Sequence, residues 1–274
     1  MLFKGSLMNS ILSSFAIAGV AVGSYMIILF IVSILRANNS IADIAWGPGF
    51  VLAGLTAFFY HEAFGPRNFL VIALLTVWGF RLGIRIFLRN RGHAEDWRYK
   101  KWRDEWGRMF FLRSFFQIFI LQGILLIVNV SPVLIVNSQK NESLTWLDTI
   151  GLAIWLIGFI FEAVGDWQLD QFLKDKANRG KVMDSGLWRY TRHPNYFGEV
   201  TMWWGIFVIA LSSPFGYLGV AGPLVISFLI LFVSGIPMTE RGMAGDAAFE
   251  AYKKRTSVFI PWFPKKSSSK GGPS

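Results

Sequence analysis

Long apolar stretches, separated by short polar segments, dominate the pattern of the chain. A helix needs about 20 residues to cross a bilayer core of about 30 Å, and seven stretches reach that length: residues 12–35, 41–62, 67–88, 109–135, 147–170, 194–212 and 215–238. The first follows only one basic residue, Lys4, and is longer than the apolar region of a signal peptide, which favours a retained helix. The pattern predicts an all-α integral membrane protein with about seven transmembrane helices, forming a single membrane domain over residues 1–264.

The composition excludes several classes of protein and of site. Hydrophobic residues make up 53% of the chain and charged residues 16%, which is too apolar for a soluble globular protein. The absence of cysteine excludes disulfides, thiol nucleophiles and cysteine-bound zinc. His61, His93 and His193 are the three histidines, and they lie so far apart in the sequence that we expect no metal site. The polar Gly/Ser-rich tract over residues 265–274 is predicted to be a disordered tail.

The distribution of basic residues predicts the orientation. The formal net charge of +10 would suggest nucleic acid as a partner of a soluble protein. Here 22 of the 27 Lys and Arg residues fall on one side of the predicted spans, in segments 89–113 and 170–193, in the tail from residue 239, and at Arg36. Because cytoplasmic loops carry excess basic residues, we expect an external N-terminus, a cytoplasmic C-terminus and no nucleic-acid partner. A basic cytoplasmic face would also suit an anionic, phosphate-bearing ligand.

Three carboxylates interrupt the predicted fifth span. Glu162, Asp166 and Asp170 are spaced i, i+4, i+8 and therefore share one face of a helix. An ionisable group in a membrane costs several kcal/mol unless it is paired or hydrated, so each one is a functional candidate. These carboxylates either contact a ligand or pair with Arg81 and Arg85 to hold the helices together.

The segment 186–199, GLWRYTRHPNYFGE, is the densest in polar residue types and leads into the predicted sixth span. Pro194 suits the first turn of a helix, whose free N–H groups form an anion site. The polar side chains that gather around this turn are Arg189, Arg192, His193, Asn195, Tyr196 and Glu199. The alternative is a capped helix start with ordinary interfacial aromatic residues.

A second polar segment, HAEDWRYKKWRDEWG over residues 93–107, joins the third and fourth spans and contains both charges and three tryptophans. This composition is typical of an amphipathic helix that lies on lipid headgroups. The alternative is a lid over a cofactor.

The segment GLWRYTRHPNYFGE, followed by Tyr252 and by Phe259-Ile260-Pro261, resembles the C-terminal domain shared by steroid 5α-reductases, sterol reductases and the isoprenylcysteine and phospholipid methyltransferases. Most closely the chain resembles the DUF1295 proteins attached to the steroid 5α-reductase family. The resemblance is strong over about residues 160–262. Upstream, the sequence LRNRG at residues 88–92 resembles the Asn-Arg-Gly that follows the third span of 5α-reductases.

The resemblance implies an NADPH-dependent reductase whose helices enclose the cofactor and a lipid-like enone, and the absence of a GxGxxG motif agrees with a site that is not of the Rossmann type. It places the dinucleotide contacts at Asn90, Arg91, Asp166, Arg192, Asn195, Tyr196, Glu199 and Tyr252. Position and charge add Arg189, His193, Glu240 and Arg255 as candidates, because guanidinium groups suit phosphate oxygens.

Two features of the family are missing. The tyrosine by which 5α-reductases protonate a carbonyl falls at Gly79 here, and their Gln-Glu pair on the second span is absent. Asp43, with Asn39 or Trp78, is the candidate group for orienting or polarising the substrate. The alternative for Asp43 is a structural pairing with Arg81 or Arg85.

Three function classes follow. The first is a reductase of a carbon–carbon double bond in a steroid-, isoprenoid- or lipid-like enone, in a bacterial inner membrane. The second is an S-adenosylmethionine-dependent lipid or isoprenylcysteine-type methyltransferase, which would use the same Arg-His-Pro-Asn-Tyr turn. The third is a non-catalytic lipid-binding membrane protein.

Overall fold

The computed structural model describes residues 2–140 and 143–265, so the predicted disordered tail lies, except for Lys265, outside the described residues. Helices form almost all of it, and the described residues contain no β-strand beyond one isolated parallel bridge between Thr191 and Ser257. The packing divides the chain into two units, Met1–Thr149 with Ile206–Val225 (unit 1) and Ile150–Gly205 with Ile226–Ser274 (unit 2).

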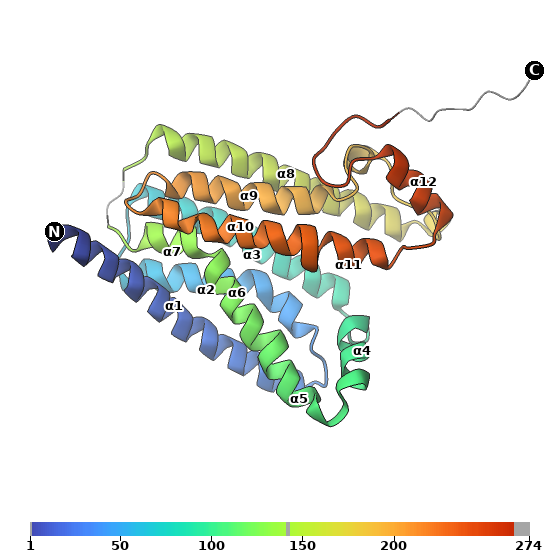
Figure 1. Cartoon of the computed structure of the whole chain (residues 1–274), viewed down its shortest axis with the longest axis horizontal. Helices are drawn as coiled ribbons and strands as arrows, with labels where there is room; N and C mark the ends of the chain where they lie inside the picture. Colours follow the sequence, from blue (N-terminus) through green and yellow to red (C-terminus); the bar gives the residue numbers. More distant parts are fainter. Residues whose placement is uncertain (1, 141–142, 266–274) are drawn as a thin grey trace, which may run out of the picture. The chain divides into compact units, whose positions relative to one another are not determined.

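Figure 1 labels the α-helices along the chain. They are α1 (Leu2–Leu35), α2 (Ile41–Tyr60), α3 (Pro66–Asn90), α4 (Trp97–Trp106), α5 (Phe110–Arg113), α6 (Leu121–Asn129), α7 (Ser131–Asn137), α8 (Trp146–Lys174), α9 (Pro194–Ala210), α10 (Ala221–Phe228), α11 (Ile236–Arg241) and α12 (Ala247–Arg255). The segments Ser114–Ile120 and Leu229–Val233 are π-helical, and short 3₁₀ turns cover Gly107–Met109, Lys176–Asn178, Gly186–Arg189 and Gly216–Val220.

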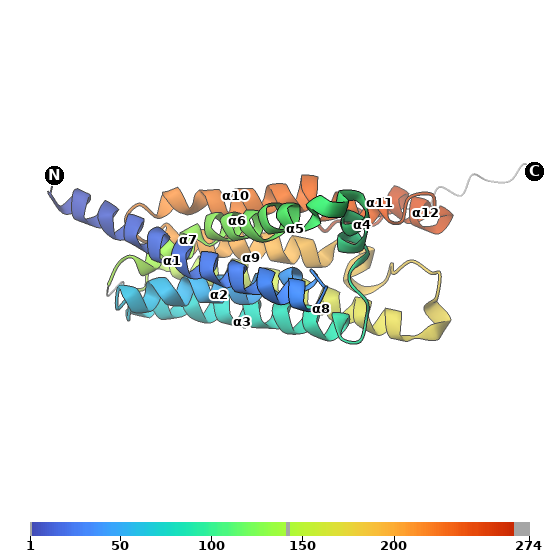
Figure 2. The same ribbon diagram turned by 90° about the horizontal axis from the view of Figure 1, so that it is seen from below.

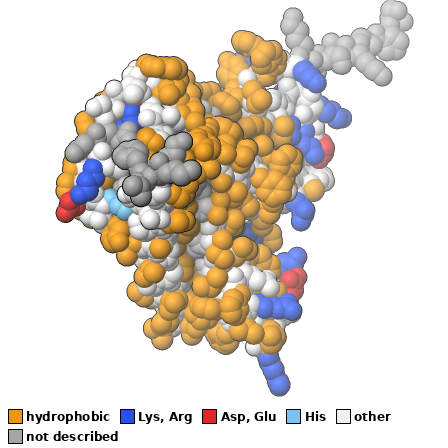
Figure 3. Space-filling view, turned by 60° about the vertical axis from the view of Figure 1, so that its left-hand side comes forward, with side chains coloured by type: hydrophobic (Ala, Val, Ile, Leu, Met, Phe, Trp, Pro, Cys, Tyr) orange, Lys and Arg blue, Asp and Glu red, His pale blue; other side chains and the backbone are white. Residues whose placement is uncertain are grey.

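The membrane class predicted from the sequence is confirmed. Six helical segments of the described chain are long and apolar enough to cross a membrane: Gly5–Leu35, Ile41–Tyr60, Pro66–Asn90, Trp97–Asn129, Trp146–Lys174 and Gly216–Arg241. Hydrophobic side chains cover most of the face seen in Figure 3. The predicted stretch 194–212 corresponds to α9, which has 17 residues and is shorter than these six. The count of seven spans and the orientation of the termini stay predictions.

The fourth predicted span differs from the structure at its end. The apolar run continues to residue 135, but α6 ends at Asn129 and α7 begins at Ser131 with a proline in its first turn. Pro132 has no N–H to donate and disfavours a helical conformation of the residue before it. Hydropathy alone does not register this break, because the pair Ser131-Pro132 stands between apolar residues on both sides.

In unit 1, α1, α2 and α3 lie side by side (Figures 1 and 2). Helices α2 and α3 approach most closely at two glycines. A β-carbon on Gly47 would lie 2.2 Å from the carbonyl oxygen of Gly79, and a β-carbon on Gly79 would lie 2.7 Å from the carbonyl oxygen of Gly47. Small residues at a helix–helix contact are the usual way in which membrane helices gain packing contacts.

A buried ion pair fixes the start of α3. Arg67 is 1% exposed, and its guanidinium is bidentate on Asp148, with Nε at 2.8 Å from Oδ1 and Nη2 at 3.1 Å from Oδ2. Arg67 also donates to the carbonyl oxygens of Ser143 and Ser212 and to the hydroxyl of Ser213. Asp148 accepts further hydrogen bonds from Thr145. Every group of this pair that burial has removed from water therefore has a protein partner.

In unit 2, α8 and α9 run side by side (Figure 1), and their backbones approach closely at two glycines. A β-carbon on Gly198 would lie 2.4 Å from the carbonyl oxygen of Gly158. Further along, Pro194 lies against Gly165, where an added β-carbon would meet its ring at 3.1 Å. This contact fixes the first turn of α9 against α8.

Candidate functional site

Hydrogen bonds hold the loop before α9 at three places. The indole of Trp188 is buried and its Nε1 donates to the carbonyl oxygen of Gly165 on α8 at 3.0 Å. The carbonyl oxygen of Trp188 accepts a hydrogen bond from the hydroxyl of Tyr252 on α12. Thr191 donates to the carbonyl oxygen of Phe259 at 2.8 Å. Residues 186–193 of the GLWRYTRHPNYFGE segment are therefore a loop that is fixed to α8, to α12 and to the C-terminal segment.

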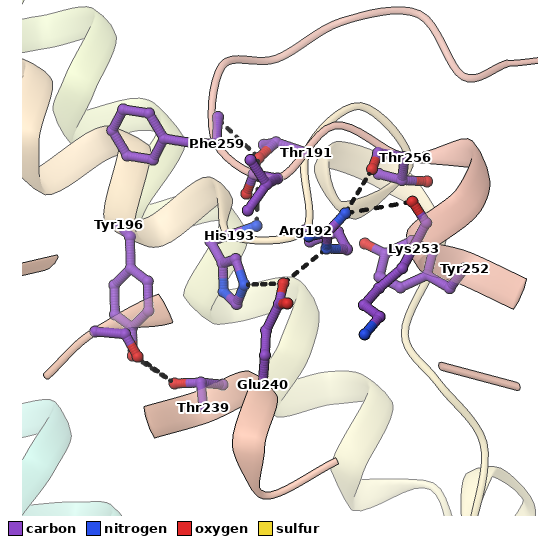
Figure 4. A network of polar contacts seen from close by, with 12 residues as sticks. Thr191, Arg192, His193, Tyr196, Thr239, Glu240, Tyr252, Lys253, Thr256 and Phe259 are labelled. Atoms are coloured by element: carbon purple, nitrogen blue, oxygen red, sulfur yellow. Dashed lines mark hydrogen bonds and ion pairs between the residues drawn. The ribbon is translucent and has the colours of Figure 1, made fainter. Parts of the chain in front are cut away.

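Three charged or titratable side chains meet at the end of this loop, and we call Arg192, His193 and Glu240 the Arg192 cluster (Figure 4). Arg192 donates from Nε to Oε1 of Glu240 at 2.7 Å, and Nε2 of His193 lies 3.0 Å from the same oxygen. Their side chains are 11%, 3% and 18% exposed for Arg192, His193 and Glu240. The cluster joins the loop before α9 to α11.

Arg192 also ties the cluster to the C-terminal part of unit 2. Its Nη1 donates to the carbonyl oxygen of Thr256 at 2.9 Å and to that of Lys253 at 3.4 Å. Its backbone N–H donates to the carbonyl oxygen of Ser257 at 2.9 Å. Nη2 makes no hydrogen bond to any residue that the structure describes, so one edge of the guanidinium is available to a ligand.

His193 is a neutral side chain at neutral pH. Burial lowers its pKa below the ordinary value of 6.5, although the hydrogen bond to Glu240 acts in the opposite direction. A carboxylate only accepts hydrogen bonds, so Nε2 carries the proton and Nδ1 is an acceptor. The ring of Tyr196 stacks on that of His193 with centroids 5.3 Å apart.

This pKa has a consequence for stability. At pH values between the folded pKa of His193 and 6.5, the unfolded chain binds more protons than the folded chain. The stability that comes from the neutral imidazole is therefore fully present above pH 6.5 and is lost as pH falls through the folded pKa. We expect the unfolding midpoint of the wild type to fall more steeply between pH 7.5 and pH 5 than that of His193→Asn. Thermal unfolding in detergent at both pH values tests this, and parallel slopes would contradict it.

The first turn of α9 presents an unsatisfied acceptor. Oδ1 of Asn195 is buried and receives no hydrogen bond from any described residue. A buried polar atom without a partner costs about 1–3 kcal/mol, so such an atom points to a ligand that donates to it. The hydroxyl of Tyr196, one residue on, lies 2.9 Å from that of Thr239 on α11.

The structure thus brings together part of the predicted cofactor set. Arg192, His193 and Glu240 are in direct contact, and Tyr252 fixes the loop that carries two of them. Asp166 is buried on α8, and Glu199 lies one turn beyond Asn195 on α9. Their contacts with a cofactor stay predictions.

Two predicted arginines line a separate hollow at the surface of unit 2. It has a volume of about 430 Å³, and its walls are formed by Asp184, Ser185, Gly186, Arg189, Arg255, Thr256, Pro264 and Lys265. Arg255 pairs with Asp184 across this hollow. Neither arginine belongs to the Arg192 cluster.

Asn90 and Arg91 lie at the end of α3 in unit 1. Oδ1 of Asn90 accepts a hydrogen bond from Arg89 at 3.4 Å, whereas its buried Nδ2 has no partner among the described residues. Arg91 is exposed and ends the helix. Their role in binding a dinucleotide stays a prediction.

The predicted catalytic residue Asp43 belongs to a polar network in unit 1. Its Oδ2 accepts from Arg98 at 2.7 Å and its Oδ1 accepts from the hydroxyl of Tyr99 at 2.7 Å. Asp43 therefore pairs with Arg98, from the polar segment between the third and fourth predicted spans. The expected alternative was a pairing with Arg81 or Arg85. Helix α4 is present, as predicted, and this network fixes it to the start of α2.

Asn39 and Trp78 have different surroundings. Asn39 donates to the hydroxyl of Ser114, and its backbone N–H donates to Glu95 at 2.8 Å, so it belongs to the same polar network as α4. Trp78 is 2% exposed and packs edge to face on Phe50, with ring centroids 5.3 Å apart. Asn39 is thus placed near polar groups, and Trp78 lies in the apolar core of unit 1.

The contact between α2 and α3 explains why a tyrosine is absent at position 79. A β-carbon there would lie 2.7 Å from both the carbonyl oxygen of Gly47 and Cγ2 of Val51. We expect Gly79→Tyr to abolish folded protein, because the two backbones leave no room for a side chain. The yield of monodisperse protein tests this, with Gly19→Ala as a control because a β-carbon on Gly19 meets nothing within 4 Å. A folded and more active Gly79→Tyr variant would contradict it.

Comparison with known proteins gives one family and several relatives. The sequence profile of the family described as "Protein of unknown function (DUF1295)" matches residues 29–256. An uncharacterized protein of Schizosaccharomyces pombe is 27% identical over 85% of this chain and 76% of its own length. The 3-oxo-5-alpha-steroid 4-dehydrogenase 1 of Bos taurus is 30% identical over 41% of this chain and 40% of its own.

A methyltransferase is also among the relatives. Methanethiol S-methyltransferase 1 of Bradyrhizobium diazoefficiens is 27% identical over 60% of each chain. The matches thus cover less than two thirds of the dehydrogenase and of the methyltransferase. No solved structure matches. Because the family profile covers most of the sequence, this multi-pass membrane protein belongs to the DUF1295 family and is similar to steroid-reductase-like and methyltransferase-like membrane enzymes.

Proposed function

We propose that this protein is a membrane-embedded NADPH-dependent reductase of a carbon–carbon double bond in a steroid-, isoprenoid- or lipid-like enone. The observation that carries the proposal is the Arg192 cluster, a half-buried ion pair of Arg192 and Glu240 with the buried imidazole of His193, in the part of the chain that resembles the reductases. The similarity to a 3-oxo-5-alpha-steroid 4-dehydrogenase supports it.

The hydrogen-bonding groups of the Arg192 cluster and of the neighbouring Asn195 fit a nicotinamide dinucleotide. Nη2 of Arg192 is a charged donor for a phosphate or carbonyl oxygen. Nδ1 of His193 and the buried Oδ1 of Asn195 are acceptors, and a carboxamide or a ribose hydroxyl provides matching donors. Oε1 of Glu240 is already shared by Arg192 and His193. We therefore assign Glu240 to holding these two side chains in position, and not to contacting the ligand through this oxygen.

Reduction of an enone adds a hydride to one alkene carbon and a proton to the other. When bound, NADPH supplies the hydride. The protein must then bind the lipid, exclude water and provide the proton. The candidate groups of unit 1 for the proton transfer are Asp43 and Tyr99, because the hydroxyl of Tyr99, which is 2% exposed, donates to the carboxylate of Asp43 at 2.7 Å.

Loss of the Tyr99 hydroxyl tests this assignment. We expect Tyr99→Phe to lower kcat about 100-fold or more, since a positioned acid or base contributes about that factor, while the affinity for NADPH stays unchanged. Tyr60→Phe, which alters an exposed phenol of unit 1, is the control. Turnover within twofold of the wild type would exclude Tyr99, and unchanged turnover of Asp43→Asn would remove Asp43 from the mechanism.

The second candidate, an S-adenosylmethionine-dependent methyltransferase, is favoured by the similarity to methanethiol S-methyltransferase 1. A non-catalytic lipid-binding protein is the third, and it predicts that substitutions in the Arg192 cluster leave lipid binding unchanged. A bacterial inner membrane stays a prediction, because the relatives come from yeast, mammals and a bacterium.

Isotope transfer separates these candidates. Purified protein in lipid nanodiscs is incubated with NADPH carrying deuterium at the transferable position of the nicotinamide, and with a set of steroid and isoprenoid enones. The reductase predicts a saturated product that contains one deuterium, and Glu240→Gln should diminish it. Transfer of a labelled methyl group from S-adenosylmethionine to a lipid or thiol, without reduction of any enone, would contradict the proposal.

A further inference from the structure

The surface hollow of unit 2 is lined by more cationic side chains than its one carboxylate neutralises. Arg189, Arg255 and Lys265 contribute three cations to its walls, and Asp184 is the one carboxylate among the residues that line it. Asp184 pairs with Arg255, which leaves Arg189 and Lys265 to attract an anion. Ser185 and Thr256 add hydroxyl groups to the wall. This combination of guanidinium, ammonium and hydroxyl donors suits a phosphate group.

The segment that ends in this hollow exposes large apolar side chains. Between α12 and Lys265 the chain has no helix or strand beyond the bridge at Ser257, and Figure 1 shows it in dark red. Ile260 is 65% exposed, Trp262 71% and Phe263 77%. Exposed aromatic residues beside basic ones are typical of the level of lipid headgroups, where tryptophan is enriched and lysine and arginine meet anionic lipid.

The backbone of this segment is nevertheless fixed. The N–H of Trp262 donates to the carbonyl oxygen of Tyr190 at 2.9 Å, and the N–H of Lys265 donates to that of Arg255 at 2.9 Å. The ring of Phe263 lies against that of Tyr190, with centroids 6.1 Å apart. Tyr190 directly follows Arg189 in the sequence. The exposed rings and the basic hollow are therefore parts of one rigid surface.

We propose that this surface binds an anionic phospholipid, with the phosphate in the hollow against Arg189 and Lys265 and with Ile260, Trp262 and Phe263 in the interfacial part of the bilayer. A dinucleotide phosphate offers the same charge, but it has no acyl chains to cover these three apolar side chains. The site is distinct from the Arg192 cluster and does not depend on the proposed reductase activity.

Native mass spectrometry of the full chain in detergent tests the proposal. Phosphatidylglycerol and phosphatidylcholine with the same acyl chains are titrated separately, and NADPH and inorganic phosphate are added as competitors. We expect retention of phosphatidylglycerol over phosphatidylcholine. The double substitution Arg189→Gln with Lys265→Gln should weaken this retention about 100-fold, because each charged hydrogen bond contributes about tenfold. Trp262→Ser should weaken it as well, whereas Lys174→Gln, which alters an exposed lysine outside the hollow, should not.

Three results would overturn the proposal. Equal retention of both lipids would exclude recognition of a net negative charge. Unchanged retention in the double variant, shown to be folded by its unfolding midpoint, would place the lipid elsewhere. Displacement of phosphatidylglycerol by NADPH or by inorganic phosphate at equal concentration would assign the hollow to a free phosphate.

Discussion

Arg67→Met is expected to lower the free energy of unfolding of unit 1 by about 3–5 kcal/mol, because it removes one partner of a buried pair and leaves a carboxylate without its counter-charge. Arg67 is 1% exposed and bidentate on Asp148. Without it, the hydrogen bonds that the carboxylate keeps within the described part of the chain are those from Thr145. Thermal unfolding in detergent, followed by circular dichroism, should show a midpoint about 10 °C lower.

A second ion pair of unit 1 provides the matched control. Nζ of Lys140 lies 2.7 Å from Oε2 of Glu62, but the two side chains are 56% and 68% exposed. Lys140→Met should therefore leave the midpoint unchanged. Combining Arg67→Met with Asp148→Leu should recover part of the loss, because no charge is then left buried. If Arg67→Met unfolds at the same temperature as Lys140→Met, the pair does not stabilise the fold.

Glu240→Ala is expected to have the largest effect on cofactor binding. Oε1 of Glu240 is shared by Arg192 and His193, so one truncation releases both side chains of the Arg192 cluster. Hydrogen bonds to charged groups contribute about 1.5–3 kcal/mol, and losing their alignment should weaken NADPH binding about 100-fold. Isothermal titration of NADPH into detergent-solubilised protein measures this change.

Two further variants show whether the effect is specific. Glu240→Gln keeps an acceptor for Arg192 and should lie between the wild type and Glu240→Ala. Glu250→Ala removes an exposed carboxylate of α12, which pairs with Lys253, and should leave NADPH affinity unchanged. Wild-type affinity in Glu240→Ala would show that the cluster only stabilises unit 2.

Local patterns in the sequence predicted the helices and much of the candidate site. Runs of apolar residues and the length of a membrane span were enough for the all-α class. The turn around Pro194 predicted that Arg192 and His193 lie together, because neighbours in a loop stay neighbours in the fold. Glu240 was included by position and charge, and it lies in contact with both, whereas its contact with a cofactor stays a prediction.

Other contacts could not be predicted because they join distant residues. Tyr99 meets Asp43 across 56 positions, and Arg67 meets Asp148 across 81. Arg67 stands just before an apolar run, so hydropathy assigns it to a loop, although it is buried. One chemical signal applies to both pairs: a charged residue at the edge of an apolar helix needs a partner.

The most direct test of the reductase assignment is a comparison of NADPH and S-adenosylmethionine binding to the purified protein, followed by quenching of tryptophan emission. We predict saturable quenching by NADPH that is weakened in Arg192→Ala and in Asn195→Ala, and no saturable quenching by S-adenosylmethionine. Saturable binding of S-adenosylmethionine without binding of NADPH would contradict the reductase and identify a methyltransferase.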